Sequence, residues 1–180
     1  MNVDLLAPVV VGLDLSLRGT GIAHADGSTE TYISVAKEAA DHGVARIVEI
    51  RDHVMAAVPH DVELVMMEGL AFDSHDTHRW NAQLAGVVRV GLYDSDAAFM
   101  LVAPGTLKKY ATGNGHASKY EVIQAAERRL HYEGASDDEA DALWLRAIGW
   151  ALLEQPIVEL PQLNRDALKV LRQQRPARRP

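Results

Sequence analysis

The chain has 180 residues, 48% of them hydrophobic and 24% charged, which suits one globular domain with a full core. It contains no cysteine, which excludes disulfides and cysteine nucleophiles, so any metal must be held by oxygen or imidazole. No apolar run reaches the roughly 18–20 residues of a membrane-spanning helix, and the N-terminus lacks the basic residues of a signal peptide. We therefore expect a soluble, cytoplasmic protein with no membrane partner.

The charge is unevenly distributed along the chain. The net charge is −7, but residues 163–180 carry +5, which leaves −12 for residues 1–162. Either the excess acid forms a solvated face, or part of it forms a cation site. The basic side chains of the C-terminal segment are Arg165, Lys169, Arg172, Arg175, Arg178 and Arg179, and its one acid is Asp166.

The N-terminal part predicts three strands joined by tight turns. Residues 9–16 are apolar or small up to a single acid, Asp14, and are typical of a buried strand. Residues 21–25 and 29–35 predict two further strands, and the Asp26-Gly27 pair between them is a strong hairpin signal. Together they predict an antiparallel meander.

Helical and extended patterns alternate in the rest of the chain. Ser136, followed three residues later by Glu139, predicts a capping box at the start of the final helix. We expect helices over 39–58, 77–94, 117–130 and from 137 to about 153, a short helix from Pro104, strands over 61–68 and 98–102, and a loop over 112–116.

This order predicts an α/β fold with a mixed five-stranded sheet flanked by helices. The helical crossovers should make the first, fourth and fifth strands parallel neighbours, with right-handed connections. We expect the domain to cover residues 1–155. Residues 156–180 contain four prolines and six of the 18 basic side chains, and we expect this tail to lose order toward its end.

Four carboxylates are predicted to meet at one edge of this sheet. Asp14 and Glu68 end adjacent parallel strands, where ligands collect in open α/β sheets. Asp138 and Asp141 share one face of the final helix. Grouped carboxylates repel one another unless cations lie between them, and oxygen ligands select Mg²⁺ or Mn²⁺. Two such ions about 4 Å apart are the usual device for phosphodiester hydrolysis.

Each acid by itself also has an ordinary structural explanation. A carboxylate at a strand end can cap a neighbouring helix. The run DDEAD over residues 137–141 suits a solvated helix N-terminus, where acids interact favourably with the helix dipole. The combination of all four acids in this order on this scaffold is more specific than any one of them.

The sequence resembles the RuvC family of Holliday-junction resolvases, within the ribonuclease H-like superfamily. The resemblance spans about three quarters of the chain, and its first piece is closer to the phage-encoded branch. The matching pieces are VVVGLDLSLRGTGIA (9–23), LVMMEG (64–69), LKKYATGNGHASKYEV (107–122) and DDEADAL (137–143).

The resemblance implies a role for each matching residue. Asp14, Glu68, Asp138 and Asp141 would hold the divalent metals, and Lys119 would lie near the scissile phosphate. Lys108 and Lys109 would contact the DNA backbone, although solvated surface lysines look the same in sequence. Gly113 and Gly115 would let the backbone approach the phosphates, or simply form a turn.

The sequence also departs from the family pattern. Phe72 is the nearest aromatic residue after Glu68 that could wedge into a junction, but its offset is unusual, and a core role is equally plausible. His75 and His78 in the loop that follows are typical of solvated histidines rather than a metal pair. The family dimerises through the next helix, where residues 84–91 could serve as an interface or as a core face.

The sequence is thus interpreted as a magnesium-dependent, homodimeric endonuclease that cuts branched DNA such as four-way junctions, leaving 5′-phosphate and 3′-hydroxyl ends, in a bacterial or phage-infected cell. One alternative is a related nuclease acting on flaps, forks or RNA-containing substrates. Another is a catalytically silent junction-binding module, although such a module gains nothing from clustered acids. A sugar or acetate kinase of the actin-like type needs a longer, two-lobed chain.

Overall fold

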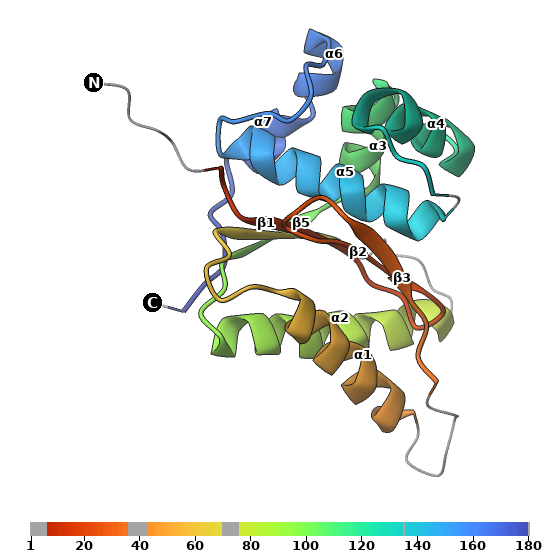
Figure 1. Ribbon diagram of the computed structural model, residues 1–180, viewed down its shortest axis with the longest axis vertical. Helices are drawn as coiled ribbons and strands as arrows, with labels where there is room; N and C mark the ends of the chain where they lie inside the picture. Colours follow the sequence, from red (N-terminus) through yellow and green to blue (C-terminus); the bar gives the residue numbers. More distant parts are fainter. Residues whose placement is uncertain (1–6, 36–42, 70–75, 135, 180) are drawn as a thin grey trace.

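The fold is a five-stranded sheet with helices on both faces (Figure 1). The computed structural model describes residues 7–35, 43–69, 76–134 and 136–179, with backbone only at 76–79. The strands are β1 (Val10–Asp14), β2 (Thr20–Ala23), β3 (Thr29–Tyr32), β4 (Leu64–Glu68) and β5 (Phe99–Val102).

The strand order is β3-β2-β1-β4-β5, as the sequence predicts. β1 and β2 pair antiparallel, as do β2 and β3, whereas β4 is parallel to both β1 and β5. Gly27 closes the β2–β3 hairpin with a φ of 95°, a backbone angle that glycine adopts without steric cost. The predicted meander and the parallel crossovers are confirmed.

Two layers of helices enclose the sheet (Figure 1). The helices α1 (Val44–Ala57) and α2 (Asp76–Asp94) cover one face, and α3 (Pro104–Thr112), α4 (Lys119–Leu130) and α5 (Asp137–Leu152) cover the other. None of the described helices is long and apolar enough to cross a lipid bilayer.

The alternation of side chains along β1 decides where its acid points. Val11 and Leu13 are buried against the α1–α2 layer, whereas Val10 is buried on the opposite face, with α5. Because successive side chains of a strand point to opposite faces, Asp14 lies on the same face as Val10 and Gly12. The only carboxylate of β1 therefore faces α5.

Glycines let α5 lie directly on the sheet. A methyl group added to Gly12 would stand 2.0 Å from the carbonyl oxygen of Ala142 in α5. A methyl group at Gly21 in β2 would stand 2.0 Å from the carbonyl oxygen of Asp138. Only a residue without a side chain fits at these two positions, so the backbones of α5 and the sheet are in contact.

The part of the C-terminal segment that the structure describes packs onto the domain, and the expected loss of order toward its end stays a prediction. The segment forms α6 (Gln162–Arg165) and α7 (Leu168–Leu171), and Leu160, Leu168 and Leu171 are buried in the core shared with α5. The backbone of Ala177 then pairs with Phe99 at the β5 edge. Three buried leucines provide apolar contacts that the proline and arginine content conceals.

We predict that Gly12→Ala destabilises the protein by about 3 kcal/mol or more, because its methyl group must push α5 off the sheet. Urea unfolding followed by circular dichroism measures this change. Gly105→Ala is the matched control, since its added methyl would meet only the carbonyl oxygen of Gly115, at 3.6 Å. Equal stabilities of the two variants would contradict close packing of α5.

Candidate active site

Two acids meet where adjacent parallel strands end. Leu13 of β1 pairs with Met67 of β4, so the next residues along the two strands are Asp14 and Glu68. Leu64 and Met66 are buried on the α5 side of β4, which places Glu68 on that same face. The carboxyl groups of Asp14 and Glu68 lie close enough for each to act on the pKa of the other.

The acids at the start of α5 divide into distinct roles. Asp138 and Asp141 act electrostatically on Asp14 and so face the strand ends. Asp137 instead forms an ion pair with Lys119, the first residue of α4. The sequence gives no sign of this division, because all of these residues belong to one acidic run.

Glu139 holds the beginning of α5 against the sheet edge. Ser136 caps the helix by accepting a hydrogen bond from the Glu139 backbone at 3.4 Å. The expected capping box is only half formed, because the Glu139 carboxylate accepts hydrogen bonds from Thr29 at 2.9 Å and Thr31 at 3.0 Å instead of returning to Ser136. These contacts to β3 fix the end of the helix that carries Asp138.

The four clustered acids disfavour one another's charges. Burial, followed by the charges of Glu68, Asp141 and Asp138, raises the pKa of Asp14 well above its usual value. Burial and the charge of Glu68 raise the pKa of Asp141 to about 7. Burial also raises the pKa values of Glu68 and Asp138. A cluster of carboxylates with raised pKa values binds cations favourably, because a cation offsets the repulsion between the negative charges.

Two lysines border the acids. The charges of Lys108 on α3 and Lys119 on α4 both act to lower the pKa of Glu68. Both also act on Asp141. The sequence indicates Lys119 as the residue nearest the reaction, whereas the structure brings Lys108 to the same acids. Spacing could have shown this, because α3 begins directly after the end of β5, beside β4.

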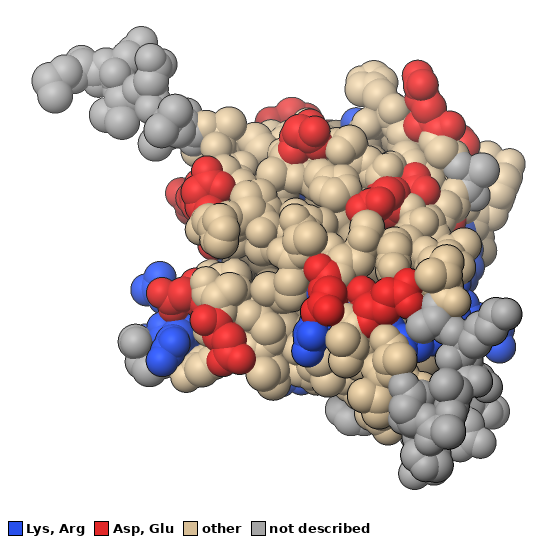
Figure 2. Space-filling model, turned by 60° about the horizontal axis from the view of Figure 1, so that its bottom comes forward, with Lys and Arg blue, Asp and Glu red and all other residues tan. Residues whose placement is uncertain are grey.

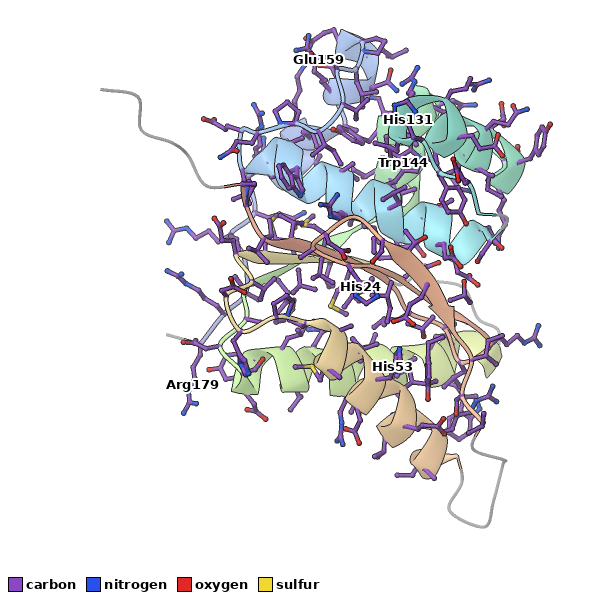
Figure 3. All side chains as sticks on the ribbon, viewed as in Figure 1. His24, His53, His131, Trp144, Glu159 and Arg179 are labelled. Carbon is purple, nitrogen blue, oxygen red and sulfur yellow. The ribbon has the colours of Figure 1, made fainter. Side chains whose placement is uncertain are left out.

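The position of α4, and with it Lys119, depends on a buried tryptophan. Trp144 of α5 lies in the core between α5 and its neighbouring helices (Figure 3), and its Nε1 donates to the carbonyl of Val122 in α4 at 3.2 Å. The ring also meets Tyr110 of α3 edge to face, with centroids 6.0 Å apart. One side chain thus holds together the three helices that carry the charged residues.

The glycine loop between α3 and α4 is a structured turn. Gly113 ends α3 with a φ of 88°, and a methyl group there would come within 3.4 Å of Leu163 in α6. Gly115 packs against the carbonyl oxygen of Gly105, which a methyl group would approach at 3.1 Å. Both glycines therefore have structural roles, and their contact with DNA stays a prediction, as does that of Lys109.

Some of the sequence predictions fall outside the described residues. Phe72 and His75 lie in the range 70–75, and the side chain of His78 is likewise not described. On α2, Leu84 and Val88 are fully buried beneath the sheet, so the core interpretation of these two positions is confirmed.

The donor atoms of the acid cluster fit a divalent cation in kind. They are all carboxylate oxygens, which hard ions such as Mg²⁺ and Mn²⁺ prefer. Within the described ranges, no three Asp, Glu or His side chains already stand in position to hold an ion together. The cluster therefore has the donor chemistry of a divalent-metal site.

Comparison with known proteins identifies the family. No family model matches the sequence. The chain is 31% identical over 149 residues to the crossover junction endodeoxyribonuclease RuvC of Synechococcus sp. strain WH7803, covering 78% of this chain and 97% of the relative. This chain belongs to the RuvC family. The RuvC of Synechococcus sp. strain CC9311 is 33% identical over 108 residues, covering 58% of this chain and 68% of that protein.

The fold agrees with this membership. The structure of Thermus thermophilus RuvC in complex with a Holliday junction substrate superposes with a TM-score of 0.64 at 18% identity, covering 94% of this chain and 99% of that one. The ribonuclease H-like RuvC fold is thereby confirmed.

We predict that Asp141→Asn stabilises the metal-free protein by about 1–2 kcal/mol, because it removes one charge from a mutually repelling buried group. Thermal unfolding in EDTA measures this gain. Addition of Mg²⁺ should raise the melting temperature of the wild type more than that of the variant, since the variant has lost a ligand. A wild type that Mg²⁺ leaves unchanged would contradict a metal site.

Proposed function

We propose that this protein is a divalent-metal-dependent endodeoxyribonuclease that resolves Holliday junctions by hydrolysing phosphodiester bonds, leaving 5′-phosphate and 3′-hydroxyl ends. The observation that carries the proposal is the convergence of Asp14, Glu68, Asp138 and Asp141 at one sheet edge, in a chain of the RuvC family. The relatives of this chain are crossover junction endodeoxyribonucleases, which supports structure-selective cutting of branched DNA as its activity.

The four carboxylates would hold Mg²⁺, with Mn²⁺ as the substitute. When bound, such ions activate the attacking water and stabilise the departing oxygen. The negative charge of the carboxylates attracts divalent cations and repels phosphate. A phosphate can therefore bind at this site only after the cations have neutralised that charge. Lys119 and Lys108 lie beside the acids and would offset the extra negative charge that develops on the phosphate.

Lys119 is held ready for this role by Asp137. Their ion pair raises the pKa of Lys119 and lowers that of Asp137, so both remain charged. The Lys119 side chain is nevertheless exposed, and its partner Asp137 lies in the first turn of α5, so the ammonium can exchange Asp137 for a phosphate oxygen. Asp137 is therefore a positioning residue in this proposal.

The distribution of charge favours DNA on the α3–α5 side. Figure 2, with the α1–α2 side turned forward, shows acidic side chains spread over that face and basic ones mainly beside them or at its margins. A phosphate backbone is repelled by such a surface. The lysines near the acid cluster and the helices α6 and α7 of the basic C-terminal segment belong to the other side, which suits a substrate crossing the sheet edge at Asp14.

A second copy of this chain is the partner we propose for α2. Val90 is 60% exposed and Tyr93 42% exposed, and an added methyl at Gly86 would meet no atom within 4 Å. Two shallow hollows share Gly86 and Val90 in their linings. Symmetric resolution of a four-way junction needs two active sites, so a homodimer through this apolar face would supply the second cut.

We predict that Asp14→Asn lowers junction cleavage by at least about a thousandfold while folding and junction binding remain, because the variant lacks one metal ligand. Labelled four-way, three-way, flap and hybrid substrates, with and without Mg²⁺, measure cleavage and substrate choice. Asp61→Asn is the control, since this exposed acid precedes the opposite end of β4. Full activity of Asp14→Asn would refute the assignment, and faster cleavage of flaps would favour the alternative substrate.

We predict that Val90→Glu makes the protein monomeric at micromolar concentration, because a carboxylate cannot be buried unpaired in an apolar interface. Sedimentation velocity measures the association state. Val44→Glu, at a residue of α1 that is 54% exposed, places the same charge on another apolar surface and should leave the dimer intact. A wild type that sediments as a monomer with junction DNA would overturn the proposed interface.

A further inference from the structure

We propose that the C-terminal segment is a second DNA-binding surface, on which α6 and α7 hold the phosphate backbone of a duplex arm leaving the active site. The inference rests on the proposed function, because the arms of a branched substrate are duplexes. It assigns a binding role to residues that lie outside the acid cluster and that the mechanism does not use.

The basic side chains form one face of an ordered helical segment. Arg165 ends α6, Lys169 lies in α7 and Arg172 directly follows α7, at intervals of four and three residues. A turn over residues 166–167 joins the two short helices, and hydrogen bonds run from Asp166 N to Gln162 O at 2.9 Å and from Arg172 N to Leu168 O at 2.9 Å. All three basic side chains are exposed. Their spacing is thus fixed by a folded element.

Few acidic groups neutralise this face. Lys169 pairs with Asp166 at 2.9 Å, and Arg165 donates to the neutral side chain of Gln162 at 3.0 Å. For Arg172 the described part of the chain supplies no ion pair within 4.0 Å. At least two guanidinium groups therefore retain their full charge for a ligand, and arginine binds phosphate oxygens with two parallel hydrogen bonds.

The basic face continues from the active site through α3. The charge of Lys108 reaches Glu68 and Asp141, at one end of this path. Hydrogen bonds from Lys169 and Gln162 lower the pKa of Asp166, which follows α6, and the charge of Lys109 on α3 acts in the same direction. The two lysines are adjacent in sequence, and they connect the acid cluster to the arginines.

Direct packing fixes α6 beside the glycine loop. The Asn164 side chain is buried and donates to the carbonyl of Tyr110 in α3 at 2.8 Å. Leu163 and Asn164 are the nearest neighbours of Gly113, at the end of α3. A duplex that crosses the loop between α3 and α4 therefore meets α6 next. A polyanion with regularly spaced charges fits this continuous surface better than a small anion would.

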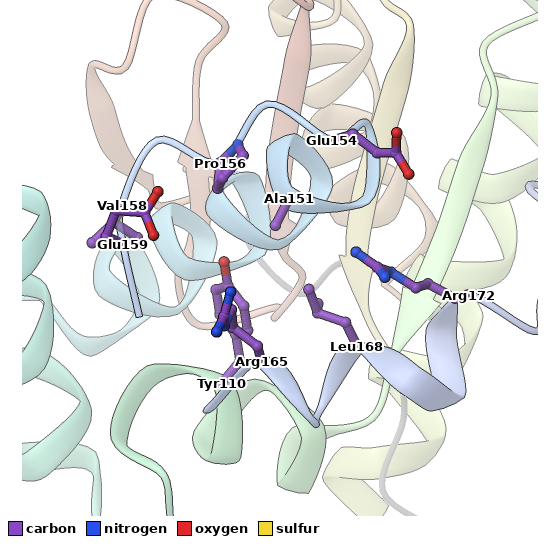
Figure 4. A pocket seen from close by; sticks show the side chains of 9 residues that line it. All are labelled: Tyr110, Ala151, Glu154, Pro156, Val158, Glu159, Arg165, Leu168 and Arg172. Atoms are coloured by element: carbon purple, nitrogen blue, oxygen red, sulfur yellow. The ribbon is translucent and has the colours of Figure 1, made fainter. Parts of the chain in front are cut away.

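A hollow beside the basic face has an acidic far wall. A pocket of about 260 Å³ lies here. In Figure 4, Arg165 and Arg172 approach it from α6 and the end of α7, while Glu154 and Glu159 belong to the segment that follows α5. The same two arginines also line a second hollow with Lys169. Glu154 and Glu159 would repel phosphates. The phosphate backbone of the duplex should therefore bind in the second hollow, where the two arginines lie beside Lys169.

The test measures the affinity for a linear duplex of about 20 base pairs. Fluorescence anisotropy reports binding in EDTA over a series of salt concentrations. For the double variant Arg165→Gln/Arg172→Gln we expect about tenfold weaker binding at physiological salt and a salt dependence reduced by about two phosphate contacts. With four-way junctions and Mg²⁺, the same variant should raise KM and leave kcat unchanged. Both arginines are exposed, so the fold should persist, and thermal unfolding checks this.

The matched control removes the same charge elsewhere on the segment. Arg178 and Arg179 follow the bridge between Ala177 and Phe99, and Figure 3 shows Arg179 on the α1–α2 side of the sheet. Arg178→Gln/Arg179→Gln should therefore change duplex affinity by less than about twofold. Glu159→Gln should strengthen duplex binding, because it removes a negative charge beside the arginines.

Each outcome decides the proposal. Equal affinities and salt dependences for the two double variants would overturn it, as would displacement of the duplex by polyglutamate at matched charge, which would identify an acidic protein as the occupant. If the wild type cleaves no junction, but Arg165→Gln/Arg172→Gln still weakens duplex binding, the result would support this surface and refute the proposed nuclease function. The two proposals thus fail separately.

Discussion

The contact between α5 and the sheet is the constraint on which the site depends. Gly12 and Gly21 leave no room for a side chain, so the backbone of α5 lies against β1 and β2. This close approach holds Asp138 and Asp141 near the ends of two strands, where Asp14 and Glu68 already stand. The tight packing of a helix on glycines is thus what converts four separate acids into one cluster, at a cost in electrostatic repulsion that the fold must offset.

The helices around α5 turn this cluster into an asymmetric site. On one side Glu139 is tied to the threonines of β3, which fixes the start of the helix. On the other side Trp144 holds α4 and α3, and these helices bring Lys119 and Lys108 to the acids. The acids at the strand ends and on α5 therefore have two lysines beside them. Under the proposed function, a phosphate would bind between the carboxylates that hold the metal and these ammonium groups.

The C-terminal segment extends the same arrangement outward. Its buried leucines complete the core over α5, and Arg165 and Arg172 remain exposed on α6 and at the end of α7. The net negative charge of the chain is compatible with the proposed DNA binding, because acidic side chains spread over the α1–α2 face, away from the proposed DNA surface. Local charge, rather than the total, decides which face can hold a phosphate backbone.

Much of this could be read from the sequence. The period of apolar residues determined the strands and helices, and the order of the elements determined the sheet, because crossover connections have one hand. The types and order of the acids indicated a cation site at the end of β1. Other features depended on contacts between distant residues. Which acids of the run 137–141 face Asp14, which one pairs with Lys119, and that Lys108 reaches the cluster were decided by how α3, α4 and α5 pack. The order of the basic tail was likewise decided by its leucines, since burial against α5 outweighs the local preference of prolines and arginines for solvent.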